Sequence, residues 1–589
     1  MHGMTKTLAL AMAAGALMSV NPAEDYSPEH LALLDPTTRV AGLCGSPRGS
    51  QSLRARLAIA ASIVTVDPAG AAPLYGGLGK IHFPITTANP QAQLYFNQGL
   101  GFAFGFNHAA AIASFREAQR LDPACALCWW GEAMAHGPNI NAPMDPDTNA
   151  RAIGTAKYAN WLARKASPAE QALTAAMLKR YSPDPNADRA ALDAAYADAM
   201  LAAAVAHPAS DDVALLAAEA AMDTLPWNYW EPDRRTPKPR LGNAVQLVET
   251  VLGRNPDHPQ AAHIYIHLME NGPDPKLAEA AADRLATPLA PAAGHLVHMP
   301  AHIYFRLGRW KDSIRANVAA ARADEAYIRS SGDRGLVRYG YYPHNVHFIV
   351  TSAQMAGDMG TAIGEARRLG EILDASTGAK LAWVQVIHAA PYFAAAQFAA
   401  PAQILAMEQP DARLPYVRAM RFYARAVARA HQRDGIGFQR ELQQLRQIRQ
   451  SGDLKPMVDQ GVPAPELLLL AETVARGRIA FARGRYGEAV RLYKDAIEIE
   501  DKLPYMEPPF WYYPVRQSLG AALYRAGRYD EAREAFMAAL ARAPNNGWAL
   551  YGLASAERAL GRRDHAAAAA AALNRAWLGN PKWLRMDRL

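Results

Sequence analysis

The apolar and polar positions of this chain predict helices along most of its 589 residues. Alanine, the strongest helix former, is very abundant, and continuous Val/Ile/Thr runs of the kind that form strands are nearly absent. No apolar run is long enough for a multi-pass membrane protein. We therefore expect an all-α protein whose mature chain has no membrane span.

One set of small and aromatic residues recurs at a fixed interval near the C-terminus. It comprises Leu519, Gly520, Leu523, Gly527, Ala532, Phe536, Ala539 and Pro544. Gly527 and Gly561 are 34 positions apart, whereas Gly484 precedes Gly527 by 43, which leaves room for an insert of about nine residues at 503–511. Gly99, Ala111, Phe115, Ala118 and Pro123 repeat the same spacing near the N-terminus.

This pattern resembles the tetratricopeptide repeat (TPR) superfamily, strongly at 472–570, clearly at 95–135 and in degenerate form at 255–375. The resemblance implies an α-solenoid, a superhelix of antiparallel helix pairs with a concave groove. It suggests a leader or linker at 1–73, a degenerate array at 74–400, a helical connector at 401–465 and regular repeats at 466–589. Grooves of this family usually bind a peptide or partner.

Seven of the 17 histidines fall between positions 263 and 347. They are His263, His267, His295, His298, His302, His344 and His347. Spacings of three and four place each set on one helix face, and offsets of 35 and 49 residues carry the same positions from one repeat to the next. The resemblance implies that these positions face the groove.

Such a cluster favours a transition-metal site. Neutral imidazoles are costly to bury without partners and charged ones repel each other, whereas a metal ion resolves both problems. Imidazoles with one nearby carboxylate, Glu270, and no cysteine favour copper, then iron or zinc, over calcium or magnesium. Seven histidines exceed the three or four that one ion takes, so one or two ions are expected. A clamp for a partner's phosphate or carboxylate, or a pH sensor, stays as an alternative.

Aromatic residues around the histidines suggest an enclosed pocket. We assign Trp227, Trp230, Tyr341 and Asn345 to substrate contacts, and Tyr342 and Glu270 to catalysis, with Glu270 as a base or a ligand. Core packing is the alternative for the aromatic residues. Cys125 and Cys128 could form a disulfide, an accessory metal pair or part of a helix packing surface. His136 begins a polar loop over 136–145 and is a candidate extra ligand, unless the loop is only structural.

The net charge and the N-terminal sequence indicate which partners and which cellular compartment to expect. Lys and Arg exceed Asp and Glu by 62 to 55, and no basic tract indicates a nucleic-acid partner. Apolar runs at 8–20 and 57–66, the second followed by Ala69-Gly70-Ala71, favour export to the periplasm over a buried N-terminal helix.

These observations lead to a hypothesis of a metal-dependent oxidoreductase, a copper or iron oxidase or oxygenase acting on a small organic substrate. One alternative is a non-catalytic scaffold that binds a protein or peptide in its groove, with the C-terminal repeats as a docking surface. The others are a metal store or chaperone and a zinc hydrolase. The sequence contains no phosphate-binding loop, dinucleotide fingerprint or nucleophile elbow.

Overall fold

The computed structural model describes residues 72–589 except 185, 232, 234, 273, 452 and 505. The predicted leader, with both candidate export segments, therefore lies outside the described residues except at its last positions. Within the described part the secondary structure is helical, and pairing of extended backbone is limited to two isolated bridges. None of the described helices has both the length and the apolar character that crossing a bilayer requires. The prediction of an all-α chain is confirmed.

The first part of the helical array ends just after His263 and His267, the first two clustered histidines. Its helices are α3 (Pro90–Phe104), α4 (His108–Leu121), α5 (Ala126–His136), α6 (Asn149–Leu162), α7 (Pro168–Met177), α8 (Arg189–Ala206), α9 (Asp211–Asp223), α10 (Pro239–Arg254), α11 (Pro259–Glu270) and α12 (Glu279–Leu285).

The middle of the chain carries the other clustered histidines. Its helices are α13 (Gly294–His298), α14 (Pro300–Arg306), α15 (Trp310–Ser331), the π-helical turn η4 (Val337–Tyr341), α16 (Tyr342–Ala356), α17 (Met359–Ile372), α18 (Ala375–Lys380), α19 (Gln385–His388) and α20 (Ala390–Phe398).

Longer and more regular pairs follow. These helices are α21 (Pro401–Leu405), α22 (Pro415–His431), α23 (Gly435–Gln450), α24 (Lys455–Asp459), α25 (Ala464–Ala482), α26 (Tyr486–Glu500), α27 (Val515–Arg525), α28 (Tyr529–Arg542), α29 (Gly547–Ala559) and α30 (Arg563–Ala576).

Glycines at one repeat position let an aromatic ring fill the space between successive helices. A Cβ atom on Gly520 would lie 2.7 Å from the Phe536 ring, and one on Gly552 would lie 2.2 Å from it. Gly99 and Gly131 enclose Phe115 in the same way. The ring of one helix therefore lies against the helix before it and the helix after it, which joins neighbouring pairs into a continuous core.

The turn between the two helices of a pair also recurs. Its glycines have φ angles of +68° to +75°, a region that other residues rarely adopt. They are Gly308, Gly357, Gly484, Gly527 and Gly561. The predicted repeat register is thereby confirmed in the middle and at the C-terminus.

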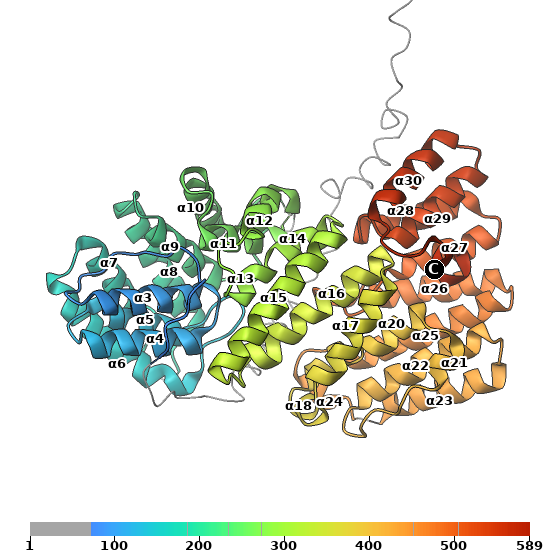
Figure 1. Ribbon diagram of the computed structural model, residues 1–589, viewed down its shortest axis with the longest axis horizontal. Coiled ribbons are helices and arrows are strands. Elements are labelled where there is room, and N and C mark those ends of the chain that lie inside the picture. The colour runs from blue at the N-terminus through green and yellow to red at the C-terminus, as the bar shows by residue number, and fades with distance from the viewer. Residues whose placement is uncertain are drawn as a thin grey trace, which may run out of the picture.

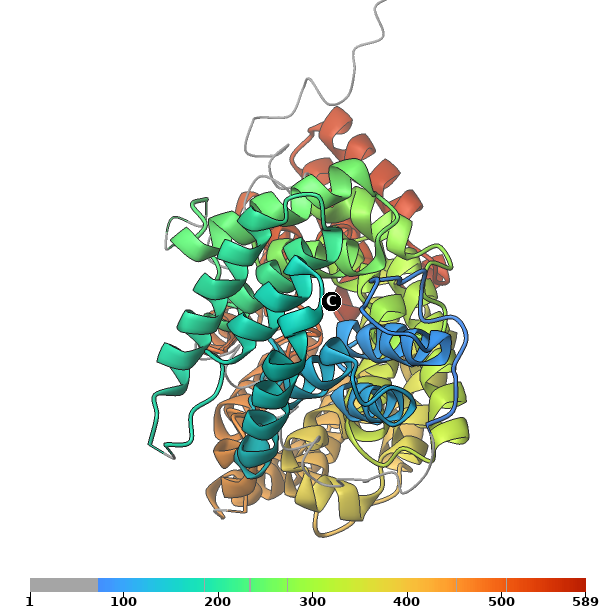
Figure 2. The same cartoon turned by 90° about the vertical axis from the view of Figure 1, so that its left-hand side faces the viewer.

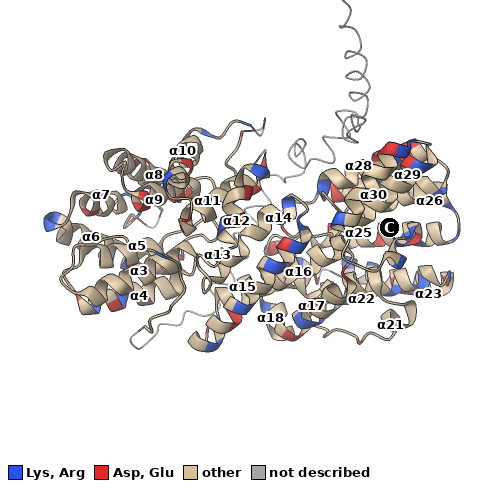
Figure 3. Ribbon diagram, turned by 45° about the horizontal axis from the view of Figure 1, so that its top comes forward, with Lys and Arg blue, Asp and Glu red and all other residues tan. Residues whose placement is uncertain are grey.

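The superhelix bends so that its C-terminal repeats contact its middle (Figure 1, Figure 2). Trp310 Nε1 donates to the Asn545 carbonyl at 3.0 Å, and Trp548 Nε1 donates to the Gln354 carbonyl at 2.8 Å. Helix α29 and the turn before it thus lie against the part of the chain that carries the histidines, and the connection between α26 and α27 reaches it through Glu507. Figure 3 shows Lys, Arg, Asp and Glu interspersed along the outer helices.

Candidate metal centre

Six of the seven clustered histidines converge in two groups of three. The first group is His263, His267 and His295, and the second is His298, His302 and His344. In each group one ring nitrogen from every histidine lies within 4.8 Å of the others. Five of the six side chains are 0% to 6% exposed and His344 is half-buried.

Local helix geometry brings the side chains together. His263 and His267 lie one turn apart on α11. His298 and His302 keep the same spacing although Pro300 divides α13 from α14. The π-helical turn η4 leads into α16, where His344 completes the second group.

Inner nitrogens of the histidines face each other at distances that suit a shared ion. His263 Nε2 and His295 Nε2 are 3.2 Å apart, and His298 Nε2 and His302 Nε2 are 2.9 Å apart. Two ligand nitrogens about 2.0–2.1 Å from one ion are separated by about 3 Å when their bonds meet near a right angle.

The outer nitrogens of four histidines face acceptors. His263 Nδ1 is 2.9 Å from Gln260 Oε1, and His298 Nδ1 is 2.6 Å from Asn317 Oδ1. His267 Nδ1 is 2.6 Å from Glu270 Oε1. The fourth, His302 Nδ1, lies 2.7 Å from Glu270 Oε2 and 2.6 Å from Glu507 Oε2.

These contacts determine which of the two ring nitrogens carries the hydrogen in a neutral imidazole. A carboxylate or amide oxygen only accepts, so each of these Nδ1 atoms donates its hydrogen outward. In the neutral rings of His263, His267 and His298, Nε2 then keeps a lone pair that points inward. His302 carries a second hydrogen on Nε2, because its two carboxylates raise its pKa to about 10. The inner nitrogen of His267 is buried without a hydrogen-bond partner. The inward lone pairs of His263 and His298, each at hydrogen-bond distance from a neighbouring ring, and the unpartnered one of His267 are donors that a metal ion could use.

The pKa values of the clustered histidines differ, because only His302 lies beside the two carboxylates Glu270 and Glu507. Burial and neighbouring imidazoles hold the pKa values of His263, His295, His298 and His344 well below the usual range. Burial opposes protonation of His302 as well, but Glu270 and Glu507 raise its pKa to about 10. Against the effect of its own burial, the neighbouring His302 and His267 lower the pKa of Glu270 to about 2. Glu270 therefore stays ionised as the hydrogen-bond acceptor of His267 and the ion-pair partner of His302.

Glu270 and Glu507 connect parts of the centre that are distant in sequence. Glu270 accepts from His267 of the first group and forms an ion pair at 2.7 Å with His302 of the second, so a single carboxylate contacts both groups. Glu507 comes from the connection between α26 and α27, 205 positions after His302. Sequence reasoning missed Glu507 as a site residue, although it lies within the nine-residue insert that interrupts the repeat period.

Aromatic rings enclose the first group. Phe106 lies 4.8 Å from the His263 ring and 5.2 Å from the His295 ring, measured between ring centroids. Trp227 meets His267 edge-on at 5.1 Å, and Tyr341 stacks on His295 at 4.6 Å. Phe106 has a φ of 55° and Trp227 one of 63°, a conformation that bulky residues adopt at a cost of about 1–3 kcal/mol. Phe106 was not predicted from the sequence, whereas Trp227 and Tyr341 were.

The second group has its own aromatic neighbour. Phe348, one turn after His344 on α16, lies 4.9–5.0 Å from the rings of His298, His302 and His344. Aromatic side chains therefore cover both groups, and where the sequence predicts an enclosed pocket the structure has a closely packed histidine cluster that could hold metal ions.

Other predicted site residues lie outside the two groups. The His347 ring lies 4.8 Å from the Tyr512 ring, tilted by 56°, and neither of its ring nitrogens has a hydrogen-bond partner. Tyr342 donates to Glu325 on α15, and Asn345 donates to the buried Asp324. Trp230 donates from Nε1 to the Leu268 carbonyl, which supports the end of α11.

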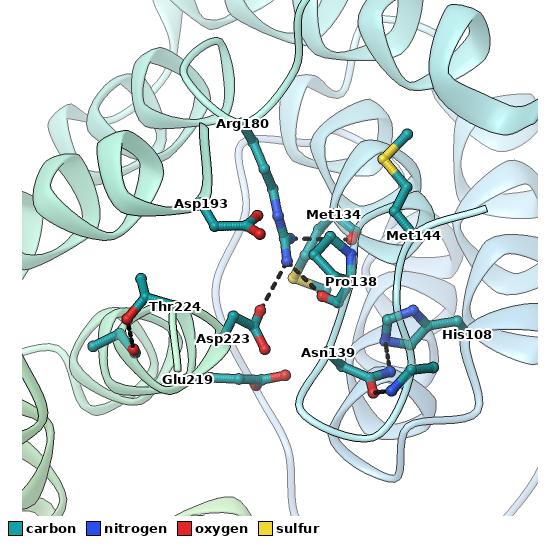
Figure 4. Close-up of polar contacts among 12 residues, drawn as sticks. His108, Met134, Pro138, Asn139, Met144, Arg180, Asp193, Glu219, Asp223 and Thr224 are labelled. Carbon is teal, nitrogen blue, oxygen red and sulfur yellow. Dashed lines mark hydrogen bonds and ion pairs between the residues drawn. The ribbon is translucent and has the colours of Figure 1, made fainter. Parts of the chain in front are cut away.

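The polar loop predicted at 136–145 covers the first group through two contacts. Asn141 Nδ2 lies 3.4 Å from the Tyr341 hydroxyl, and Trp227 Nε1 donates to the Ile140 carbonyl. Buried Arg180 anchors the loop, because it donates to the Pro138 carbonyl at 2.6 Å and to Asp223 at 2.9 Å (Figure 4).

The remaining accessory candidates lie near the start of that loop. His136 is 3.6 Å from Glu132 and belongs to none of the metal groups among the described residues. Cys125 and Cys128 form a disulfide at the start of α5, which answers the choice left open by the sequence.

Known proteins resemble this chain in one sequence repeat and, at low similarity, in structure. The tetratricopeptide repeat model matches residues 515–546, which span α27 and α28. Similar solved structures include the human IFIT1 dimer with m7Gppp-AAAA, at 12% identity and a TM-score of 0.29, covering 90% of this chain and 96% of that one. Another is yeast Tom70, at 11% identity and a TM-score of 0.24, covering 84% and 87%. No curated protein matches the sequence. Residues 515–546 thus match the tetratricopeptide repeat, and the described helices pack glycines on aromatic rings in the same way at both ends of the chain.

Proposed function

We propose that this protein holds two transition-metal ions side by side, one in each histidine group. The observation that carries the proposal is the direction of the imidazole protons. Four outer nitrogens donate to Gln260, Asn317, Glu270 and Glu507. This leaves the inner nitrogens of His263, His267 and His298 free to act as ligands, and that of His302 becomes a ligand when an ion displaces its second proton.

The ligand set favours copper. Each group consists of imidazoles, and the nearby carboxylates are occupied with hydrogen bonds from outer nitrogens. Nitrogen sites bind copper(II) most tightly among the divalent first-row metals. Iron and zinc are the next candidates.

We further propose an oxidoreductase that acts on a small organic substrate with dioxygen. Copper ions, when bound, supply one-electron and dioxygen chemistry. The chain's own contribution is to hold protons on the outer nitrogens through Glu270 and Glu507 and to exclude water with Phe106, Trp227 and Phe348. Export to the periplasm remains part of the proposal, and the Cys125–Cys128 disulfide supports it because disulfides persist in oxidising compartments.

The first test is elemental analysis of protein purified without a histidine tag and dialysed against a weak chelator. We expect two equivalents of copper in the wild type, about one in His295→Ala and in His344→Ala, and none in the double variant. The exposed His82 provides the control, because His82→Ala removes an imidazole outside both groups and should leave two equivalents.

Oxygen consumption with phenols and amines then tests the reaction. Copper-loaded wild type should consume oxygen, and the double variant should not. Two equivalents of zinc would instead favour hydrolysis, and copper without turnover would favour a metal store. Metal-free wild-type protein of full stability would contradict the metal centre and favour the scaffold.

A further inference from the structure

Gln260 lies between the first histidine group and a polar residue of a neighbouring helix. Its side chain is fully buried. Gln260 Oε1 is 2.9 Å from His263 Nδ1, and its Nε2 is 3.1 Å from Glu219 Oε2 on α9. The amide therefore connects a metal-group histidine to a carboxylate outside the centre.

The orientation of this amide decides which nitrogen of His263 carries the proton. With Oε1 toward the ring, Nδ1 donates and Nε2 keeps its lone pair for a metal. If the amide turned over, its NH2 group would donate to Nδ1, and the proton would move to the nitrogen that faces the other histidines. The shape of the amide alone does not distinguish the two orientations.

Glu219 supplies the distinction. Burial raises the pKa of Glu219 to about 7, although Arg180 and the hydrogen bond from Gln260 oppose the shift. Above that pH the carboxylate is ionised and has no hydrogen to donate, so the NH2 end of Gln260 faces it and the oxygen end faces His263. Gln260 is the hydrogen-bond donor that the structure gives this carboxylate among the described residues.

In the second group an amide side chain is likewise held in one orientation, but by a main-chain carbonyl. Asn317 accepts from His298 Nδ1 with its oxygen and donates from Nδ2 to the Ser313 carbonyl at 2.8 Å. A main-chain carbonyl also only accepts, so it fixes the asparagine in the corresponding orientation. The first group differs because its anchor is a side chain that can be replaced.

The surroundings of Glu219 explain why its carboxylate remains available to Gln260. Glu219 and Asp223 border a small cavity together with His108, Arg180 and Tyr196. Figure 4 shows Glu219, Asp223, Arg180 and His108 around this region. Arg180 is hydrogen-bonded to Asp223 and to the Pro138 carbonyl, and no hydrogen bond joins it to Glu219. Arg180 is thus paired with Asp223 and does not compete with Gln260 for the Glu219 carboxylate.

We propose that Glu219 is a positioning residue that selects the metal-binding tautomer of His263 through Gln260. This inference rests on the proposed metal centre. According to this proposal, the metal affinity of the first histidine group depends on Glu219 and that of the second group does not. Glu219 lies on α9 and contacts no histidine of either group.

The experiment compares the metal affinity of the two groups by competition titration with a chelator. Glu219→Gln lets Gln260 face either way, so affinity at the first group should fall about 10–100-fold, the usual effect of losing an outer-shell partner. The second group should keep its wild-type affinity and serves as an internal reference. Glu249→Gln is the matched control, because Glu249 accepts from Tyr265 on the same α11 at 2.9 Å but contacts no metal-group histidine.

A reciprocal exchange separates positioning from a structural role. In Glu219→Gln with Gln260→Glu, the new carboxylate at 260 accepts from His263 and from the amide at 219. The hydrogen-bond directions at His263 are then restored, and the affinity of the first group should return to within a few-fold of wild type. Chemical denaturation of every variant in the metal-free state checks that the fold is retained.

Each outcome has a distinct meaning. Wild-type affinity in Glu219→Gln, or no recovery in a stably folded exchange variant, would overturn the positioning role while two bound ions leave the metal centre intact. Wild-type protein that binds no metal would instead contradict the proposed function.

Discussion

Each histidine of the centre uses its two nitrogens for different purposes. The inner nitrogen faces the other rings of its group, and the outer nitrogen of four of them donates to an amide or carboxylate. The acceptors therefore determine whether the inner nitrogen is a ligand. Substitution of an acceptor tests this division without removing any imidazole.

Glu270 and Glu507 should have separable effects. Glu270→Gln weakens the hold on His267 and His302, so we expect metal affinity to fall about 10–100-fold at both groups. Glu507→Gln affects only His302 and should weaken the second group alone. Competition titration of the two sites measures both changes, and an equal loss at both sites in Glu507→Gln would contradict the assignment.

His108 provides a pH-dependent prediction away from the metal groups. Burial and the adjacent Arg180 lower the pKa of His108 to about 4, below its unfolded value of 6.5. Between these values the unfolded chain binds one more proton than the folded one, so this contribution to stability is present above pH 6.5 and is lost as the pH falls toward 4.

Denaturant unfolding at several pH values measures that loss. The stability difference between wild type and His108→Asn should shift against the wild type by at most about 1.4 kcal/mol per pH unit from 6.5 to 4. A constant difference across this range would show that His108 is not held neutral.

The convergence of the candidate ligands was predictable from the sequence because these histidines lie on consecutive repeats and share a periodicity. The six grouped histidines, Glu270, Trp227 and Tyr341 all have short-range spacing signals. Glu507 and Phe106 have none, since a superhelical bend and a left-handed turn bring them to the centre. His347 has the right helical spacing, but it packs on Tyr512 instead.

At the level of elements, the repeat pairs are held by close contacts between glycines and rings. The sequence predicted these pairs at both ends, because Gly520 and Phe536 have the same 16-residue separation as Gly99 and Phe115. The break between α13 and α14 and the π-helical turn before α16 depend on tertiary packing and carry no such repeat signal.

Two glycine-to-alanine changes should act in opposite directions. Gly520→Ala places a methyl group 2.7 Å from the Phe536 ring and should destabilise the protein by about 1–3 kcal/mol. Gly364→Ala on α17 meets no atom within 4 Å and should stabilise it by up to about 1 kcal/mol through helix propensity. Chemical denaturation compares the two, and equal effects would contradict the packing described.

The anchor of the loop at 137–142 is a buried ion pair. Arg180→Met leaves Asp223 buried without its cation and should cost about 3–5 kcal/mol. Replacing both, with Arg180→Met and Asp223→Leu, should recover most of that loss in denaturant unfolding. If the double variant were as unstable as the single one, the backbone contacts of Arg180 would dominate its role.

At the level of the whole molecule, the metal centre joins segments that the repeat array separates. It takes residues from α11, α13, α14 and α16 and from the connection before α27. Bound ions should therefore stabilise the entire fold and not only one repeat.

Metal removal tests this stabilisation. Chelator-treated protein should unfold at a lower temperature, and added copper at about 1,000 times its Kd should restore about 4 kcal/mol per site. Differential scanning calorimetry measures the shift. The His295→Ala, His344→Ala double variant should show no response to copper, and a response of wild-type size would place the binding elsewhere.

The long separation between His302 and Glu507 also sets an order of events during synthesis. All six grouped histidines leave the ribosome before Glu507, which follows His302 by 205 positions. At translation rates of about 5–20 residues per second, the nascent chain carries a partly built centre for on the order of 10–40 s. An ion captured in that interval would meet a second group that lacks one of its carboxylates, so the centre that the finished protein selects can form only after translation has passed the α26–α27 connection.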